Sequence, residues 1–191
     1  VRTRLGLDKQ ALATAAKRFS PEVEQVRIMT PDKDLGQCLV GDRVVQVDRI
    51  RRKTIDEAAL RERRGVAPRS IPDYLALVGD TADGIPGLKG FGEKASSTLL
   101  GRYGHIEDIP ADTAAWEVKP RGAAKLAATR AEHHDDVLLY RRLATLVEDV
   151  PLTEIAAAVG TPFYCYSTAT FERHIRVFDE ALAGLVIQVV R

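Results

Sequence analysis

The chain has 191 residues and a mass of 21.0 kDa, and 45% of its residues are hydrophobic while 29% are charged. This length and composition suit one ordinary folded domain, with or without an appendage, and they exclude collagen-like and disordered chains. The 28 Lys and Arg residues nearly balance the 27 Asp and Glu residues, so net charge by itself predicts no nucleic-acid partner.

The two cysteines, Cys38 and Cys165, lie far apart and have no metal-like spacing around them. This argues against a disulfide scaffold or a zinc site and favours a reducing compartment. No apolar run reaches the roughly 18 residues that would span a bilayer, and residues 1–7 lack the apolar core of a signal peptide. We therefore expect a soluble, cytoplasmic protein without a membrane partner.

Helix and strand patterns alternate through residues 1–50. Apolar residues at helical spacing predict a helix over residues 8–19. Short apolar runs predict strands over residues 25–30 and 43–48, with a brief helix over residues 35–39 between them. This order is typical of a parallel sheet. Because two strands are too few for a stable sheet layer, we expect further strands upstream of residue 1.

Most of the remaining chain has helical patterns separated by Gly and Pro. Residues 79–92 hold five of the 14 glycines, which predicts tight turns and close backbone approach there. The sequence therefore indicates an α/β protein that is mostly helical. Further helices are predicted over residues 55–64, 70–78, 93–103, 121–131, 133–146, 153–159 and 168–183, and strands over residues 163–166 and 185–190.

Four aspartates form two pairs at predicted element ends, Asp32 with Asp34 and Asp80 with Asp83. Ligands gather beyond the carboxyl ends of strands in open α/β sheets, where Asp32 and Asp34 are expected. Clustered carboxylates without His or Cys suit Mg²⁺ or Mn²⁺. Two such ions roughly 3.5–4 Å apart would stabilise both the attacking and the leaving oxygen in phosphodiester cleavage. The alternative is an ordinary turn or helix cap, because Asp side chains also accept hydrogen bonds from nearby backbone N–H groups.

A Gly-x-x-Gly-x-Gly turn runs into a predicted helix at residues 87–95. Backbone N–H groups at such a helix start can face a phosphate, and lysines in the turn add positive charge. This is a helix-hairpin-helix signature, which predicts sequence-independent DNA binding that weakens as salt rises. An ordinary tight turn between helices is the alternative. The predicted DNA-binding residues are Gly87, Leu88, Lys89, Gly90, Phe91, Gly92 and Lys94, and the carbonyls of Leu88, Gly90 and Phe91 are a candidate site for a monovalent cation.

A basic stretch lies in the sequence between the first acidic pair and the glycine turn. A DNA backbone that reached both would pass it, so phosphate contact is one interpretation and an ordinary solvated face is the other. Its residues are Arg49, Arg51, Arg52 and Lys53, followed by Arg61, Arg63, Arg64 and Arg69.

In this order, the motifs resemble those of the bacterial 5′ nuclease family, which comprises the 5′–3′ exonuclease domain of DNA polymerase I and free-standing relatives homologous to flap endonucleases. The resemblance rests on residues 30–35, 71–87 and 90–95. It covers roughly residues 11–150. It implies a PIN-like partial parallel sheet, truncated at its N-terminus, followed by a helix-hairpin-helix domain. The expected boundaries are residues 1–53 for the first domain and residues 54–150 for the second.

The same resemblance implies a function. In that family, aspartate-bound Mg²⁺ ions activate water to attack a phosphodiester at a 5′ end or flap junction, and a hairpin with a potassium ion holds the downstream duplex. The resemblance thus implies a divalent-metal-dependent 5′–3′ exonuclease or flap endonuclease of DNA replication and repair, with duplex or 5′-flap DNA as its partner. The alternative is a non-catalytic, sequence-independent duplex DNA-binding module. The implied metal ligands and catalytic residues are Asp32, Asp34, Asp80 and Asp83, and the implied potassium ligands are Leu88, Gly90 and Phe91.

The chain departs from the family's pattern at the start of its first predicted helix. A Glu-x-Asp-Asp motif is expected there, yet the chain has Leu7-Asp8-Lys9-Gln10, with Asp8 out of register. We therefore expect this chain alone to cleave DNA poorly or not at all.

Residues 151–191 have a different resemblance, because residues 151–184 are similar to the N-terminal segment of the PLP-dependent diaminopimelate decarboxylases. That chemistry requires a lysine imine, and no lysine follows Lys125. We therefore expect no PLP, and a foreign-looking tail that has a packing role or none.

Overall fold

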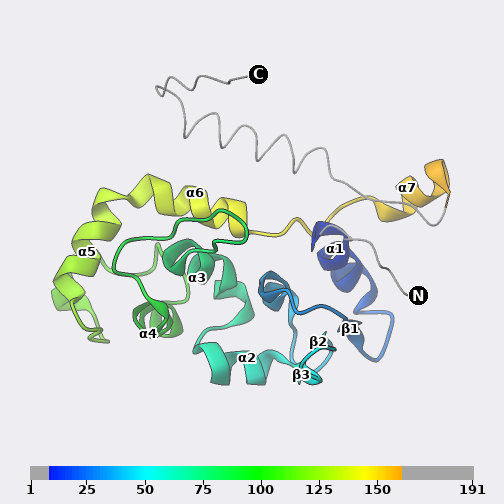
Figure 1. Cartoon of the computed structure of the whole chain (residues 1–191), viewed down its shortest axis with the longest axis horizontal. Coiled ribbons are helices and arrows are strands. Elements are labelled where there is room, and N and C mark those ends of the chain that lie inside the picture. The colour runs from blue at the N-terminus through cyan, green and yellow to red at the C-terminus, as the bar shows by residue number, and fades with distance from the viewer. Residues whose placement is uncertain (1–8, 161–191) are drawn as a thin grey trace, which may run out of the picture.

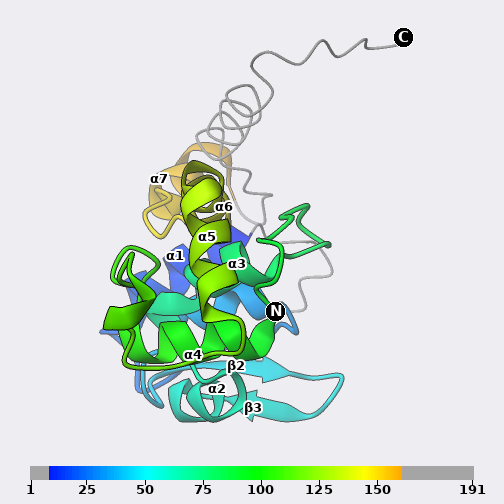
Figure 2. The ribbon, with the colours of Figure 1, turned by 90° about the vertical axis from the view of Figure 1, so that its left-hand side faces the viewer.

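A small sheet part and a larger helical part make up residues 9–160, which a computed structural model describes (Figure 1). The sheet part includes α1 (Lys9–Phe19). The helical part extends from α2 (Glu57–Arg64) to α6 (His134–Ala144), and Figure 2 shows its helices from a second side. The elements expected over residues 163–190, and Cys165 among them, lie outside the described residues.

The sheet has three strands in the order β1-β2-β3. β1 (Val26–Ile28) runs parallel to β2 (Val44–Asp48), which confirms the predicted parallel pair. β3 (Lys53–Ile55) pairs antiparallel with β2, so the sheet is mixed rather than purely parallel as expected. Asp48 fixes the turn between them, because its carboxylate accepts hydrogen bonds from the backbone N–H groups of Ile50 and Arg51, both at 2.9 Å.

Glycines follow the last residue of several helices, as the sequence predicts, and α2 also has a side-chain cap. α2 (Glu57–Arg64) begins after Asp56, whose carboxylate accepts from the Ala59 N–H at 2.7 Å, and ends at Gly65 in the left-handed region. The other α-helices are α3 (Ile71–Val78), α4 (Glu93–Tyr103), α5 (Ala123–Glu132), α6 (His134–Ala144) and α7 (Leu152–Val159), and the 3₁₀ turns are η1 (Lys33–Cys38), η2 (Pro68–Ser70) and η3 (Thr113–Ala115).

The apolar helix α3 is the centre of the larger core. It packs against α4 and α6, and every residue from Ile71 to Leu77 is buried (Figure 1). Since an apolar helix gains most by burial on all sides, its position follows from its composition. The core around it includes Leu60, Val66, Tyr74, Leu75, Leu77, Phe91, Leu99, Leu100, Ile106, Trp116, Leu126 and Val137.

A smaller core lies between α1, η1 and the sheet, around Ala13, Leu35 and Val44. The chain that leaves α6 returns to this core and contributes Leu146 to it (Figure 1). The Gln37 side chain fixes this return, because its amide donates to the Ala144 carbonyl at 3.1 Å and accepts from the Leu146 N–H at 3.0 Å. The sheet part and the helical part are therefore joined at both ends of the helical part.

The buried carboxylate of Asp73 connects separate segments within the helical part. Asp73 of α3 is 1% exposed and accepts hydrogen bonds from the His105 ring at 2.9 Å and the Ile106 N–H at 3.2 Å. Arg141 of α6 also donates to it, at 3.4 Å. Because a buried carboxylate needs such partners, these contacts attach α3 to the segment that follows α4 and to α6. Among residues 9–160, no helix combines the length and apolarity that a bilayer crossing needs.

The larger core predicts a strong stability effect at Leu99, whose side chain is fully buried. Leu99→Ala is expected to lower the free energy of unfolding by about 2–5 kcal/mol, because it removes apolar contacts and leaves a cavity. Urea denaturation followed by circular dichroism measures this change. Ile50→Ala is the control, since Ile50 is 84% exposed, and its change is expected to stay within about 0.5 kcal/mol. Equal effects of the two substitutions would contradict the assigned core.

Candidate metal centre and nucleic-acid interface

Asp34 is buried at the carboxyl end of β1, inside the 3₁₀ turn η1. Asp32 begins this turn, because its carboxylate accepts from the Asp34 N–H at 3.1 Å. The Gln46 amide of β2 holds the approach to the turn by donating to the carbonyls of Thr30 and Asp32, at 2.9 Å and 2.6 Å. The turn therefore presents Asp34 in one orientation, with only 3% of the residue exposed.

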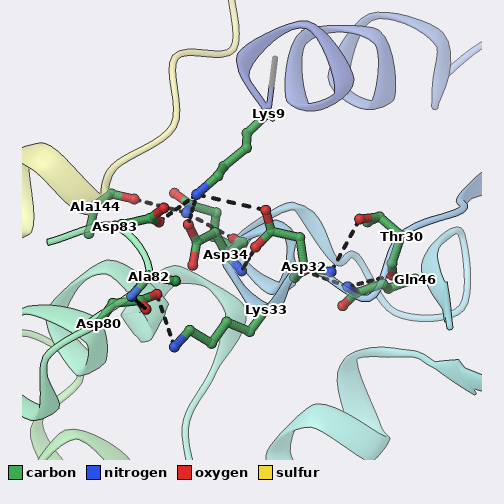
Figure 3. Close-up of polar contacts among 11 residues, drawn as sticks. Lys9, Thr30, Asp32, Lys33, Asp34, Gln46, Asp80, Ala82, Asp83 and Ala144 are labelled. Carbon is green, nitrogen blue, oxygen red and sulfur yellow. Dashed lines mark hydrogen bonds and ion pairs between the residues drawn. The ribbon is translucent and has the colours of Figure 1, made fainter. Parts of the chain in front are cut away.

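Asp80 and Asp83 lie in the turn that follows α3. Asp80 and Ile85 exchange two backbone hydrogen bonds, at 2.7 Å and 2.8 Å, and the Asp80 carboxylate accepts from the Ala82 N–H at 3.1 Å. These bonds close a short loop that points both carboxylates toward η1 (Figure 3). One carboxylate oxygen from each of Asp34, Asp80 and Asp83 lies within 4.8 Å of the others.

The fourth predicted ligand, Asp32, lies beside this group of three and not within it. One of its oxygens caps η1, and the other lies 3.7 Å from the Lys9 ammonium group. The helix-cap interpretation therefore applies to Asp32, while Asp34, Asp80 and Asp83 form the acidic cluster.

Two lysines that sequence reasoning did not include contact this acidic cluster (Figure 3). The Lys9 ammonium group lies 2.5 Å from Oδ2 of Asp34 and 2.5 Å from Oδ2 of Asp83. The Lys33 ammonium group lies 2.9 Å from Oδ2 of Asp80. The sequence signal for Lys9 was its position in the expected Glu-x-Asp-Asp motif, but only the fold shows that its side chain reaches the other acids.

Burial and ion pairing shift the pKa values of the charged residues in the cluster in different directions. Burial raises the pKa of Asp34 above its usual value, and the hydrogen bond with Asp83 raises it further, although Lys9 acts in the opposite direction. Burial would also raise the pKa of Asp83, but its contacts with Asp34 and Lys9 outweigh burial and lower it. The pKa of Lys9 is raised, because its two carboxylate partners outweigh the effect of burial. Lys9 and Asp83 therefore carry opposite charges and form an ion pair at 2.5 Å.

The donor set fits a hard divalent cation. Its oxygens are all carboxylate oxygens, from two segments of the chain, and Oδ1 of Asp34 is buried without a hydrogen-bond partner. A buried carboxylate oxygen without a partner is costly, and a metal ligand role would satisfy it. Mg²⁺ and Mn²⁺ bind through such oxygens and keep several waters.

Close backbone contact forms the glycine hairpin between α3 and α4. A Cβ on Gly87, where φ is +72°, would lie 2.6 Å from the backbone nitrogen of Gly79. The predicted close approach is thereby confirmed at these two glycines, since no larger residue would fit. The Leu88 N–H donates to the Leu77 carbonyl at 2.8 Å, which attaches the hairpin to α3.

The predicted DNA-binding residues divide into a buried and an exposed group. The side chains of Leu88 and Phe91 belong to the core, so only their backbone can meet a ligand. Lys89 and Lys94 are exposed, and α4 begins at Gly92 without a side-chain cap. The exposed lysines and the helix start suit an anion such as phosphate. The potassium site at Leu88, Gly90 and Phe91 stays a prediction.

Two basic pockets connect the hairpin with the acidic cluster. One, of about 430 Å³, lies between α2 and α4 and includes Lys94 of the hairpin helix in its lining. The other, of about 250 Å³, lies between α2 and the sheet and includes Lys33, which contacts Asp80. Arg63 and Arg64 line both pockets. Positive charge therefore runs from the hairpin toward the acids, and it includes Arg63 and Arg64 of the basic stretch that the sequence offered as a phosphate contact.

Comparisons with known proteins identify the fold and the family. A family model described as 5′-3′ exonuclease, C-terminal SAM fold, matches residues 66–161. The 5′-3′ exonuclease of Aquifex aeolicus is 35% identical over 152 residues, which are 79% of this chain and 50% of that protein. Thermostable DNA polymerase I of Thermus aquaticus is 39% identical over 141 residues, which are 74% of this chain and 16% of that protein.

Solved structures of the bacteriophage T5 5′-exonuclease share the fold. A structure with bound divalent zinc aligns with a TM-score of 0.56 at 21% identity, over 88% of this chain and 59% of that one. A flap endonuclease pseudo-enzyme-product complex with DNA and metal ions aligns with a TM-score of 0.53 at 19% identity, over 90% of this chain and 59% of that one.

The chain spans about half the length of the curated exonuclease that it matches. The family-model match ends about ten residues beyond the expected boundary at residue 150. The match includes residues 71–87 and 90–95, on which the sequence resemblance rests, while residues 30–35 lie outside it. The chain therefore belongs to the 5′–3′ exonuclease family, whose members include free-standing exonucleases and the N-terminal domains of DNA polymerase I.

Proposed function

We propose that this chain is the DNA-gripping and metal-binding portion of a 5′ nuclease that hydrolyses phosphodiesters of duplex or 5′-flap DNA. The observation that carries the proposal is the convergence of Asp34, Asp80 and Asp83 within 4.8 Å, beside the hairpin. Family membership supports the reaction class, and the hairpin supports a duplex substrate. The fold relative from bacteriophage T5 forms a complex with DNA and metal ions, which supports both partners.

Asp34, Asp80 and Asp83 would hold Mg²⁺ or Mn²⁺, with Asp32 adjacent. When bound, such an ion supplies charge stabilisation for the phosphodiester and a more acidic water. The chain's own residues orient the substrate. The α4 start and the exposed Lys89 and Lys94 would hold phosphates of the duplex, and Arg63 would hold a phosphate on the way to the acidic cluster.

A non-catalytic duplex DNA-binding module is the second candidate. The ion pair between Lys9 and Asp83 favours it, because an ammonium group within the acidic cluster opposes the binding of divalent ions. In this case the hairpin holds DNA and no hydrolysis follows.

The hairpin predicts salt-dependent DNA binding through its two exposed lysines. Lys89→Ala and Lys94→Ala are each expected to weaken duplex binding and to reduce the slope of log K against log salt by about 1, since each removes one phosphate contact. Fluorescence anisotropy with a labelled duplex, titrated with KCl, measures both quantities. Lys17→Ala is the control, because Lys17 lies on α1 and pairs with Glu148. Unchanged slopes for the hairpin variants would contradict the phosphate role.

The basic pockets predict a second group of phosphate contacts. Arg63→Ala is expected to weaken binding similarly for duplexes of different sequence, because it removes charge and no base contact. The same anisotropy assay, run with two unrelated duplex sequences, measures this effect. Arg18→Ala is the matched control, since Arg18 is an exposed arginine that pairs with Glu22 and lines neither basic pocket. A sequence-selective loss would argue against a backbone path.

The acidic cluster predicts loss of any metal-dependent cleavage on neutralisation. Asp80→Asn/Asp83→Asn is expected to reduce cleavage of a 5′-flap duplex with Mg²⁺ on the order of 100-fold or more, because ligand carboxylates are removed. Asp135→Asn, at an exposed position of α6, is the control. Equal cleavage by both variants would remove the metal role of these acids. Salt-sensitive binding without cleavage by the unaltered chain would favour the DNA-binding module.

A further inference from the structure

Lys9 occupies an unusual position for a lysine at the first residue of a helix. Its ammonium group bridges Oδ2 of Asp34 and Oδ2 of Asp83, at 2.5 Å each, and lies 3.7 Å from Oδ2 of Asp32 (Figure 3). These partners lie 25 and 74 positions away in the sequence for Asp34 and Asp83. A cation shared by carboxylate oxygens from separate segments is the arrangement expected of a bound metal ion.

The remainder of α1 holds Lys9 in this position. The Thr14 hydroxyl accepts from the Val150 N–H at 3.2 Å, and Gln10 accepts a hydrogen bond from the Val147 N–H. Residues Gln10, Ala13 and Thr14 are buried, so α1 is fixed against the chain that leaves α6. The Lys9 side chain is 30% exposed, which leaves an open side toward solvent. The ammonium group is therefore held by the fold and can still be displaced.

Lys9 and a divalent ion compete for the same atoms. Oδ2 of Asp34 and Oδ2 of Asp83 already contact the ammonium group, and Lys33 contacts Oδ2 of Asp80. Oδ1 of Asp34 is the buried cluster oxygen without a partner among the described residues. A divalent ion needs several oxygens at once, so it must displace the ammonium group or bind beside a like charge.

We propose that Lys9 is an internal cation that sets the affinity of the acidic cluster for divalent ions: its ammonium group is the counter-ion of Asp34 and Asp83 in the absence of metal, and divalent ions bind only by displacing it. This inference rests on the proposed metal site. It differs from that proposal because it concerns affinity and not the existence of the site.

Metal titration of Lys9→Met tests the inference, since methionine keeps an unbranched side chain and removes the charge. Binding of Mn²⁺ to the full chain is followed by electron paramagnetic resonance of the free ion. Removal of one positive charge beside the ion position is expected to tighten Mn²⁺ binding by at least about tenfold. Lys17→Met is the matched control on the same helix, because Lys17 is exposed and pairs with Glu148 outside the cluster, and its Mn²⁺ affinity is expected to equal that of the unaltered chain.

Thermal unfolding provides a readout that does not depend on catalysis. Without metal, Lys9→Met is expected to lower the melting temperature, because the carboxylates lose their shared counter-ion. Addition of Mn²⁺ is then expected to raise the melting temperature more than it does for the unaltered chain. If Lys9→Met does not fold, Lys9→Gln provides the same measurement with a polar side chain.

Each outcome has a definite meaning. Tighter Mn²⁺ binding together with a larger thermal shift supports the internal cation. Equal Mn²⁺ affinity of the unaltered chain and Lys9→Met overturns the internal cation. Loss of that binding in Asp34→Asn then shows that the metal site itself stands. If neither the unaltered chain nor Lys9→Met binds Mn²⁺ at millimolar concentration, the internal cation and the metal site are overturned together. Duplex binding, measured separately, shows whether the DNA-binding part of the proposed function is affected.

Discussion

The negative charge of the buried Asp34 carboxylate needs compensation, and this requirement governs the arrangement of the whole site. Asp34 is almost fully enclosed, and charge in such a place must be paired, protonated or bound to a cation. The fold supplies partners from the turn after α3 and from the start of α1, which are far apart in the sequence. The sheet part and the helical part therefore meet at a cluster of charges, and both their packing and their chemistry depend on how that charge is balanced.

The burial of α3 determines where the functional residues can lie. The helix is enclosed on all sides, and it ends at the glycine that opens the acidic turn. The turn with Asp80 and Asp83 directly follows the C-terminal end of α3. The hairpin attaches to the same helix, because the Leu88 N–H donates to the Leu77 carbonyl. Asp73 attaches α3 to the segment that follows α4 and to α6. A rigid buried helix thus supports a site made of short turns, which is the usual division between scaffold and loops.

Much of this arrangement could be predicted from the sequence, because it follows from local signals. The helices begin and end near the predicted residues, since apolar spacing indicates their extent and Gly and Pro separate them. The parallel pairing of β1 with β2 was expected because a brief helix separates two apolar runs, which is the strand-helix-strand order of a parallel sheet. The convergence of Asp34 with Asp80 and Asp83 was expected from the resemblance to a family whose motifs occur in the same order.

Other features depend on tertiary contacts that no local pattern contains. β3 is only three residues long and lies in a basic stretch, so hydrophobic alternation could not reveal it. Lys9 and Lys33 lie within or beside motifs that the sequence singled out, but their contacts with the acids depend on the direction of their side chains in the folded chain. Asp32 illustrates the same point, because its spacing from Asp34 suits a ligand and a helix cap equally well, and only the fold shows that it caps η1. Its role as a metal ligand stays a prediction. The two basic pockets arise from residues of α2, α4 and the sheet, which only the fold brings together.

The contact between Gly79 and Gly87 has a consequence for the turn that lies between them. The two ends of the loop that holds Asp80 and Asp83 are in close backbone contact at these glycines, so a side chain at either position would force the ends apart. The acidic turn and the glycine hairpin are consecutive segments that share this contact. A substitution at Gly87 would therefore disturb the position of the carboxylates as well as that of the hairpin.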